Sequence, residues 1–367
     1  MKLDIKQDTK QDTKQEKHRT KTWNKYLALF GLCAVLGITG CGNKEIKEAY
    51  ETAAAALEEG DYETAETGFQ TVAETEEMLP EAYRGLGIAQ FNQGKYAEAC
   101  IALSKSLLYL EDENVEFETD VKSYLAAARM KREEYEEAIK LYDELIQTDK
   151  NAEYYFLRGK CYINTGDYES AKTDFDQAAE KSDDYMLFLN IYEIYDELQM
   201  NADGSAYLEQ ALKLVSENDY YSRGLIHYYL QDYTKAKEVL IKAINADQDA
   251  KAMMLLGKVY LSLDDAANAR AMYQEHINDP KLAPEAYNGL ALCDIAEESY
   301  TSALENIQKG LEYGDTEVKQ SLLFNEICVY EYLKEWSTAR TKASEYVQMY
   351  PGDEAGAREY AFLNHYE

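Results

Sequence analysis

Apolar and aromatic residues between positions 155 and 178 follow two successive helical patterns. Apolar side chains recur at i, i+3, i+4 and i+7 on both sides of a turn at residues 166–167. This spacing predicts two helices of about 13 residues each. Gly159 and Ala171 are small where large neighbours are common, so we expect the helix axes to cross there at about 8–10 Å. Tyr162 and Phe175 would fill the surrounding volume. Because one hairpin cannot bury both of its faces, further copies must stack against it.

The same block returns along the chain with a period of about 34 residues. Its turn marker, Tyr168 in the clearest copy, is followed three residues later by Ala or Gly in every copy. The nine markers are Tyr62, Tyr96, Tyr135, Tyr168, Asn201, Tyr233, Ala266, Tyr300 and Trp336. This order of aromatic, Gly, Tyr and Ala positions resembles the tetratricopeptide repeat (TPR) consensus. The fifth and ninth copies depart most from it, with Asn201 leading the turn and Ile327 replacing the helix glycine.

The resemblance implies an all-α fold, a right-handed α-solenoid of about nine TPR helical hairpins over residues 46–350. Residues 351–367 would then form a C-terminal capping helix that gives the stack a solvated end. Another helical-hairpin solenoid, such as the Sel1-like class with its longer period, is the alternative. Residues 107–119 hold a strongly acidic excess between the second and third copies. This excess either lengthens a helix or forms a solvated loop.

The first 40 residues predict an export signal. A polar, basic stretch precedes an apolar run at residues 26–38, which spans about 20 Å as a helix and is too short for a roughly 30 Å hydrocarbon core. Residues 38–41, Ile-Thr-Gly-Cys, resemble a bacterial lipobox. That resemblance implies a lipoprotein signal peptide over 1–40, lipidation of Cys41 and a tether over 41–45. It places the chain on the extracytoplasmic face of a bacterial cell membrane. An uncleaved anchor with an incidental Cys is the alternative.

The formal net charge of −31 excludes one class of partner. A nucleic-acid binder needs a basic surface to neutralise phosphates, so we expect no nucleic-acid partner. The acidity serves either solubility or a preference for basic partners or divalent cations.

No constellation of residues typical of an enzyme occurs in the sequence. The histidines are too far apart to converge on one metal: His18, His227, His276 and His365. No Cys-x-x-Cys pair exists, so zinc and thioredoxin-type sites are not indicated. Among the remaining cysteines, Cys293 and Cys328 lie on adjacent copies and could form a bridge. We expect no cofactor, no metal, no small-molecule substrate and no catalytic activity.

The TPR resemblance places partner contacts on the first helix of each hairpin, along the concave groove. Mapping the family's groove positions onto this chain gives Arg84, Phe91, Phe156, Lys160, Tyr221, Leu225, Tyr228, Lys258 and Phe324 as the candidates. Aromatic residues with a few cations are typical of recognition surfaces. The competing interpretation is that several of these side chains seal neighbouring first helices together. The Lys and Asn pair with which TPR chaperone receptors hold a carboxylate is missing from the first four copies.

These features predict a non-catalytic, lipid-anchored scaffold that binds a protein or peptide partner through the groove. An envelope assembly factor, of the kind found among TPR lipoproteins of pilus or outer-membrane assembly, is the second hypothesis. A sugar- or peptide-binding lipoprotein that feeds a transporter would need two α/β lobes, which the helical pattern does not favour.

Overall fold

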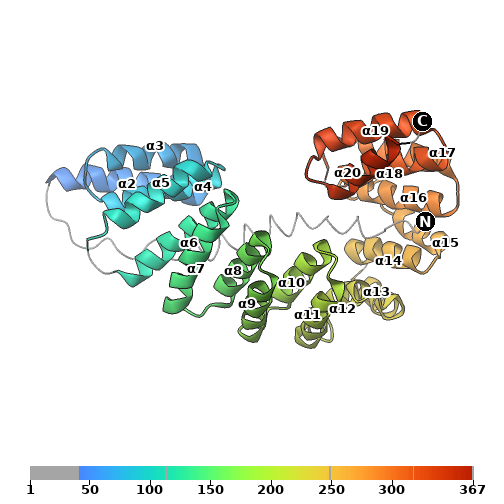
Figure 1. Ribbon diagram of the computed structural model, residues 1–367, viewed down its shortest axis with the longest axis horizontal. Coiled ribbons are helices and arrows are strands. Elements are labelled where there is room, and N and C mark those ends of the chain that lie inside the picture. The colour runs from blue at the N-terminus through green and yellow to red at the C-terminus, as the bar shows by residue number, and fades with distance from the viewer. Residues whose placement is uncertain (1–40, 112–113, 248, 317, 366–367) are drawn as a thin grey trace. The chain divides into compact units, whose positions relative to one another are not determined.

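The computed structural model describes residues 41–365 apart from 112–113, 248 and 317 (Figure 1). The described residues form nineteen helices and no strand, which confirms the all-α prediction. The predicted signal peptide at residues 1–40 lies outside the described residues. In the part of the chain that is described, no helix is both long enough and apolar enough to span a membrane.

The helices alternate between a first helix (A) and a second helix (B) of nine hairpins. The A helices are α2 (Cys41–Glu59), α4 (Leu79–Asn92), α6 (Val115–Lys131), α8 (Ala152–Thr165), α10 (Tyr185–Glu197), α12 (Tyr220–Tyr229), α14 (Ala250–Ser262), α16 (Ala283–Ala296) and α18 (Lys319–Tyr332). The B helices are α3 (Tyr62–Ala73), α5 (Tyr96–Leu108), α7 (Tyr135–Thr148), α9 (Tyr168–Glu180), α11 (Asn201–Leu214), α13 (Tyr233–Asp247), α15 (Ala266–Gln274), α17 (Tyr300–Leu311) and α19 (Trp336–Met349). A last helix, α20 (Glu354–Leu363), follows the ninth hairpin.

The predicted repeat period is confirmed residue by residue. Each of the nine turn markers is the first residue of a B helix, including Asn201 and Trp336 in the two copies that depart from the consensus. The residue three positions later is 0% exposed wherever it is Ala, as at Ala65, Ala171 and Ala339. The fifth and ninth copies therefore have the same repeat register as the other seven.

The turn inside each hairpin has one backbone geometry throughout. The residue two positions before each marker has a positive φ, and it is Gly in only three copies: Gly60, Gly94, Glu133, Gly166, Gln199, Gln231, Asp264, Glu298 and Lys334. The following N–H then donates to a carbonyl five residues back, for example Asp167 N to Tyr162 O at 2.9 Å and Glu335 N to Tyr330 O at 2.8 Å. This is the hydrogen bond of a Schellman cap, which ends the A helix and aims the chain into the B helix.

Small residues permit the close crossing of helices A and B, as predicted. A Cβ added at Gly159 would lie 2.7 Å from Cε1 of Phe175, which is itself 0% exposed. In the ninth copy the equivalent residue is Ile327, which is also 0% exposed. The ninth hairpin therefore accommodates a branched side chain at the same depth.

The chain divides into two compact units, with the boundary at residue 191 inside α10. In the unit that ends at 191, buried clusters join the first three hairpins, as Phe69 does with Leu86 and Leu103 does with Val121. In the unit that begins at 192, a continuous cluster runs from Met254 to residue 333. Each unit is built from stacked hairpins, as the repeat pattern predicts.

The C-terminal helix α20 caps the last hairpin. Asp353 accepts from the N–H groups of Ala355 and Gly356 at 2.9 and 3.3 Å, so it is the N-cap of α20. At the other end, Arg340 Nε donates to the carbonyl of Leu363 at 3.0 Å, and the Leu363 side chain is 0% exposed. The predicted capping helix is therefore part of the stack.

Residues 41–45 differ from the prediction of a tether, because helix α2 already begins at Cys41. The helix continues toward the N-terminus through the pairs Lys44–Glu48 and Lys47–Glu51, with N–O distances of 3.6 and 3.9 Å. Such i,i+4 pairs support a helix.

The acidic excess between copies two and three falls partly into a longer A helix. Helix α6 has 17 residues and begins at Val115. Asn114 caps it by accepting from Phe117 N at 3.1 Å.

Candidate partner-binding site

The nine predicted groove residues lie on A helices, and none of them is exposed. Phe156, Leu225 and Tyr228 are buried, at 5%, 8% and 8% exposure. The other six are half-buried: Arg84, Phe91, Lys160, Tyr221, Lys258 and Phe324. The three buried side chains have little surface to offer a partner.

Two of the predicted cations are already paired with the next A helix. Arg84 Nε on α4 donates to Asp120 Oδ2 on α6 at 2.5 Å, and both side chains are nearly buried. Although burial alone lowers the pKa of Arg84, the charge of Asp120 more than offsets it, so the guanidinium stays ionised. Lys258 Nζ on α14 lies 3.1 Å from Glu285 Oε1 on α16. Both pairs connect one copy to the next.

The predicted aromatic contacts also pack within the stack. The ring of Phe91 lies 5.4 Å from that of Tyr96 and 6.1 Å from that of Tyr124, between centroids. Phe156 lies 5.9 Å from Phe175, with Lys160 Nζ 5.8 Å from the Phe156 centroid. The contact between Phe91 and Tyr124 matches the competing interpretation that such residues seal neighbouring A helices, whereas the contacts of Phe91 with Tyr96 and of Phe156 with Phe175 join the two helices of one hairpin. A role for any of the nine in partner binding stays a prediction.

The exposed apolar side chains are on other elements. Among the described residues, the exposed large apolar side chains are Ile101, Leu108, Tyr109, Val115, Tyr168, Leu214, Ile241, Tyr313, Met349 and Phe362. Six of these ten belong to B helices, and Val115, the first residue of α6, is the sole member on an A helix. The surface that remains available for apolar contact is therefore on the B helices and the helix ends.

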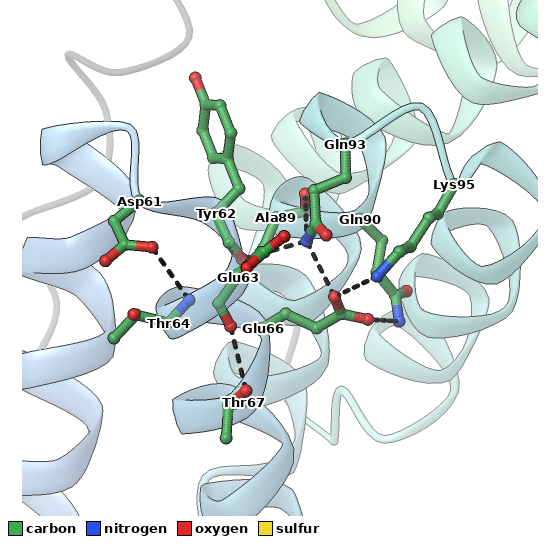
Figure 2. A network of polar contacts seen from close by, with 10 residues as sticks. All are labelled: Asp61, Tyr62, Glu63, Thr64, Glu66, Thr67, Ala89, Gln90, Gln93 and Lys95. Atoms are coloured by element: carbon green, nitrogen blue, oxygen red, sulfur yellow. Dashed lines mark hydrogen bonds and ion pairs between the residues drawn. The ribbon is translucent and has the colours of Figure 1, made fainter.

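A polar clamp joins the B helix of copy one to the end of the next A helix (Figure 2). Glu66, the fifth residue of α3, accepts from Gln90 Nε2 at 3.1 Å, Gln93 Nε2 at 2.8 Å and Lys95 Nζ at 2.7 Å. Burial raises the pKa of Glu66, but the three donors together more than offset it and leave the pKa below its usual value. A carboxylate therefore fits between a B helix and the end of the following A helix.

The seventh copy has the same clamp with the charges reversed. Arg270, the fifth residue of α15, donates through Nη2 to Asp294 Oδ1 at 2.8 Å and to Glu297 Oε2 at 2.6 Å. Asp294 and Glu297 stand at the positions that Gln90 and Gln93 occupy in copy two. The fifth residue of the B helix therefore forms an ion pair with the following copy at two separate interfaces.

Between copies two and three the equivalent position is Cys100, which faces Arg129 and Arg132. Both arginines pair with Glu134 from their own turn, Arg132 Nη2 to Glu134 Oε1 at 2.7 Å. Burial raises the pKa of the Cys100 thiol, although the two arginines oppose that shift. The thiol is therefore neutral at pH 7 and does not supply the charge that Glu66 supplies one copy earlier.

An open pocket lies at this same interface. It is lined by Cys100, Ile101, Ser104, Lys105, Leu108, Arg129 and Arg132. Ile101 is 60% exposed and Leu108 is 76% exposed. Sequence reasoning did not single out these residues, because it searched the A helices only.

The cysteines Cys161, Cys293 and Cys328 are all free. Cys161 and Cys293 are free and buried, and burial raises the pKa of each to about 12. Cys328 is also free, so the structure has no bridge between Cys293 and Cys328. Within the described residues, no group of His, Cys, Asp and Glu could hold a metal ion.

Family models described as tetratricopeptide repeat match three stretches of the chain, residues 50–109, 152–185 and 221–284. These three stretches are therefore similar to tetratricopeptide repeats, and neither family model describes an enzyme. Among solved structures, yeast Tom70 is 15% identical, with 97% of this chain and 87% of that chain covered and a TM-score of 0.48. A tetratricopeptide repeat protein from Parabacteroides merdae is 18% identical, with 77% and 99% covered and a TM-score of 0.43. At these scores the likeness says nothing about what this chain binds.

Proposed function

We propose that this chain is a non-catalytic scaffold, anchored by lipid on the outer side of a bacterial membrane, that binds a protein or peptide partner. The repeats support the binding role. Stacked hairpins hold their surface side chains in place, so a partner meets a preformed surface at little ordering cost. The exposed apolar side chains of Ile101 and Leu108, which line one open pocket, carry the proposal, because contiguous exposed apolar surface marks interaction sites on proteins.

The lipid anchor rests on the sequence of residues 38–41. If Cys41 receives a diacylglycerol, the chain should incorporate labelled palmitate in its host, and Cys41→Ser should abolish the label. Mass spectrometry of the N-terminal peptide would check the cleavage site. A wild-type chain that carries no label and keeps its first 40 residues would rule out the anchor.

A pull-down from envelope extract of the host tests the binding role. The bait would be residues 42–367, which omit only Cys41, the first residue of α2, from the described helices. We expect at least one protein to be retained specifically. Phe156→Ala and Tyr228→Ala are poor controls because both side chains are buried. The half-buried pair Lys160→Gln with Tyr221→Ala probes the A-helix face with less risk to the stack. If the bait retains no protein in larger amount than an unrelated control protein does, the proposal is contradicted.

The second candidate is an envelope assembly factor that acts inside a multiprotein complex. The specific observation in its favour is that exposed apolar side chains lie on several B helices, as Leu214, Ile241 and Met349 do. Several separate contacts suit a chain with more than one neighbour. Cross-linking in cells distinguishes the two: one adduct favours a peptide-binding scaffold, and several envelope proteins in one particle favour the assembly factor.

A further inference from the structure

We propose that the pocket between α5 and the end of α6 binds an acidic, amphipathic peptide segment of the partner. Ile101 and Leu108 would contact its apolar side chains, while Lys105, Arg129 and Arg132 would pair with its carboxylates. The inference rests on the proposed binding role and deepens it, because it names the surface and the chemistry of the ligand.

The apolar part of the pocket is unique to the second copy. Five residues after the turn marker, the other eight copies have Thr, Lys, Thr, Ala, Glu, Ala, Glu and Thr where copy two has Ile101. Twelve residues after the marker, the others have Glu, Gln, Glu, Lys, Asn, Asn, Glu and Gln where copy two has Leu108. Repetition of the hairpin therefore does not explain either side chain. Both lie at positions that the rest of the chain leaves to polar or small residues.

The spacing of the two apolar residues defines the shape of the ligand. Seven residues separate Ile101 and Leu108 on one helix, which is about 10 Å along the axis. Apolar residues at i and i+7 of a second helix have the same separation. An amphipathic helix can thus place one apolar side chain against each of them.

The charge of the pocket selects an acidic ligand. Lys105 is exposed, and the side chains of Arg129 and Arg132 are 30% and 35% exposed. Glu134 pairs with both arginines and Glu137 also lies within electrostatic range of Arg129, so three positive charges face two negative ones, and the buried thiol of Cys100 adds none. In a chain with a net charge of −31 this is a local excess of positive charge. Charge complementarity with an acidic segment follows.

The clamp of copy one shows that the site can accept a carboxylate. Glu66 occupies the equivalent position and is held by three N–H donors, one from the following A helix and two from the turn after it (Figure 2). At Cys100 that carboxylate is missing from the B helix. Arg129 and Arg132 replace the two amides, and Glu134, at the position of Lys95, pairs with both arginines. A glutamate from the ligand would bring a second carboxylate to the two guanidinium groups, from the side of Cys100, opposite the one that Glu134 provides.

The test uses the full chain in a mild detergent and a fluorescent 16-residue peptide with Leu at positions 5 and 12 and Glu and Ala elsewhere. A second peptide has Gln in place of Glu. Binding is measured by anisotropy at low and high salt. The pocket variant is Ile101→Ser, Lys105→Gln, Leu108→Ser. The matched control is Ile241→Ser with Lys242→Gln, an exposed apolar residue beside a cation on another B helix.

We expect the acidic peptide to bind at least about tenfold more tightly than the Gln peptide, and the pocket variant to lose at least about tenfold in affinity. The control variant should bind as the wild type does. High salt should weaken binding because ion pairs contribute to it. Circular dichroism should show unchanged helicity in both variants.

Three outcomes would overturn the inference. They are no binding at millimolar peptide, equal affinity for the two peptides, or equal affinity of the wild type and the pocket variant. Anionic vesicles and a second copy of the chain are separate arms. If the pocket variant loses vesicle binding or self-association but keeps the peptide, the surface serves a membrane or a dimer. A partner retained from extract by both wild type and pocket variant would leave the proposed function standing and place its site elsewhere.

Discussion

The two helices of each hairpin use their outward faces differently. A helices lie beside the A helix of the next copy, and their cations and aromatics are engaged there, as Arg84 is with Asp120. B helices have the larger exposed apolar side chains, of which Leu108 is the most exposed. Aromatic and cationic composition alone therefore does not identify a binding surface in a solenoid. Only the side chains that are not engaged in contacts between copies are available to bind a partner.

The largest difference between buried positions at the helix crossing and exposed positions on the B helices should appear in the free energy of unfolding. Phe175 is 0% exposed at the crossing of α8 and α9, whereas Ile101 is 60% exposed on α5. Phe175→Ala should lower the free energy of unfolding by about 3–5 kcal/mol because it leaves a cavity. Ile101→Ala should change it by less than about 0.5 kcal/mol. Urea unfolding followed by circular dichroism measures both, and equal effects would remove the distinction.

The A-helix face can be tested through its ion pair. Arg84→Gln should destabilise the stack by about 2 kcal/mol, because it leaves Asp120 nearly buried with its charge uncompensated. The double variant Arg84→Met with Asp120→Leu should recover most of that loss. If Arg84→Gln is as stable as the wild type, the pair with Asp120 does not stabilise the stack, and Arg84 would be available to a partner.

The last A helix offers a test that depends on pH. Burial, and then the negative charge of Glu359, raise the pKa of Glu331 on α18 to about 8. The folded state therefore binds this proton more tightly than the unfolded state, whose pKa is near 4.5. Stability from this group is complete below about pH 4.5 and is lost as pH rises toward 8. Because the group is only half-buried, we expect about 1–2 kcal/mol.

Glu331→Gln is the control for that pH dependence. Thermal unfolding from pH 5 to pH 9 should show a smaller decline in the variant than in the wild type. Since Glu359 belongs to α20, release of the capping helix should be the first event at high pH. Parallel pH profiles in the two proteins would exclude Glu331 as the cause.

The smallest expected effect concerns the turn that joins the A and B helices of a hairpin. Glu298 has a φ of 57°, at the position where Gly166 stands in the fourth copy. Glu298→Gly relieves the strain of a left-handed residue but makes the unfolded chain more flexible, so a net gain of about 0.5 kcal/mol is expected. Glu297→Gly, one residue earlier in the chain, should destabilise instead. A loss of stability in Glu298→Gly would contradict the shared turn geometry.

The fold was readable from the sequence because its determinants are local and repeated. The marker, the small residue three positions later and the turn all lie within a few residues, so their spacing predicts helix starts to the residue, as at Asn201 and Trp336. The exposure of A-helix positions was not readable in that way. Whether Arg84 faces solvent or Asp120 depends on how a helix 36 residues further along the chain packs against it. The start of α2 at Cys41 was also missed.

The pocket had a signal in the sequence that a comparison between copies could have found. Ile101 and Leu108 are apolar at positions where the other copies have polar or small residues. A search of A helices alone did not include them. In a repeat protein, a residue that differs from its equivalents in the other copies is a stronger indication of function than one that agrees with them.

Hydrogen–deuterium exchange on the complex with the partner recovered from envelope extract tests the central claim most directly. If the B-helix surface of copy two binds the partner, added protection should concentrate in α5 and in the last turn of α6, while α8, α12 and α14 exchange as in the free chain. Protection of those A helices with α5 unchanged would contradict the account and return the site to the groove.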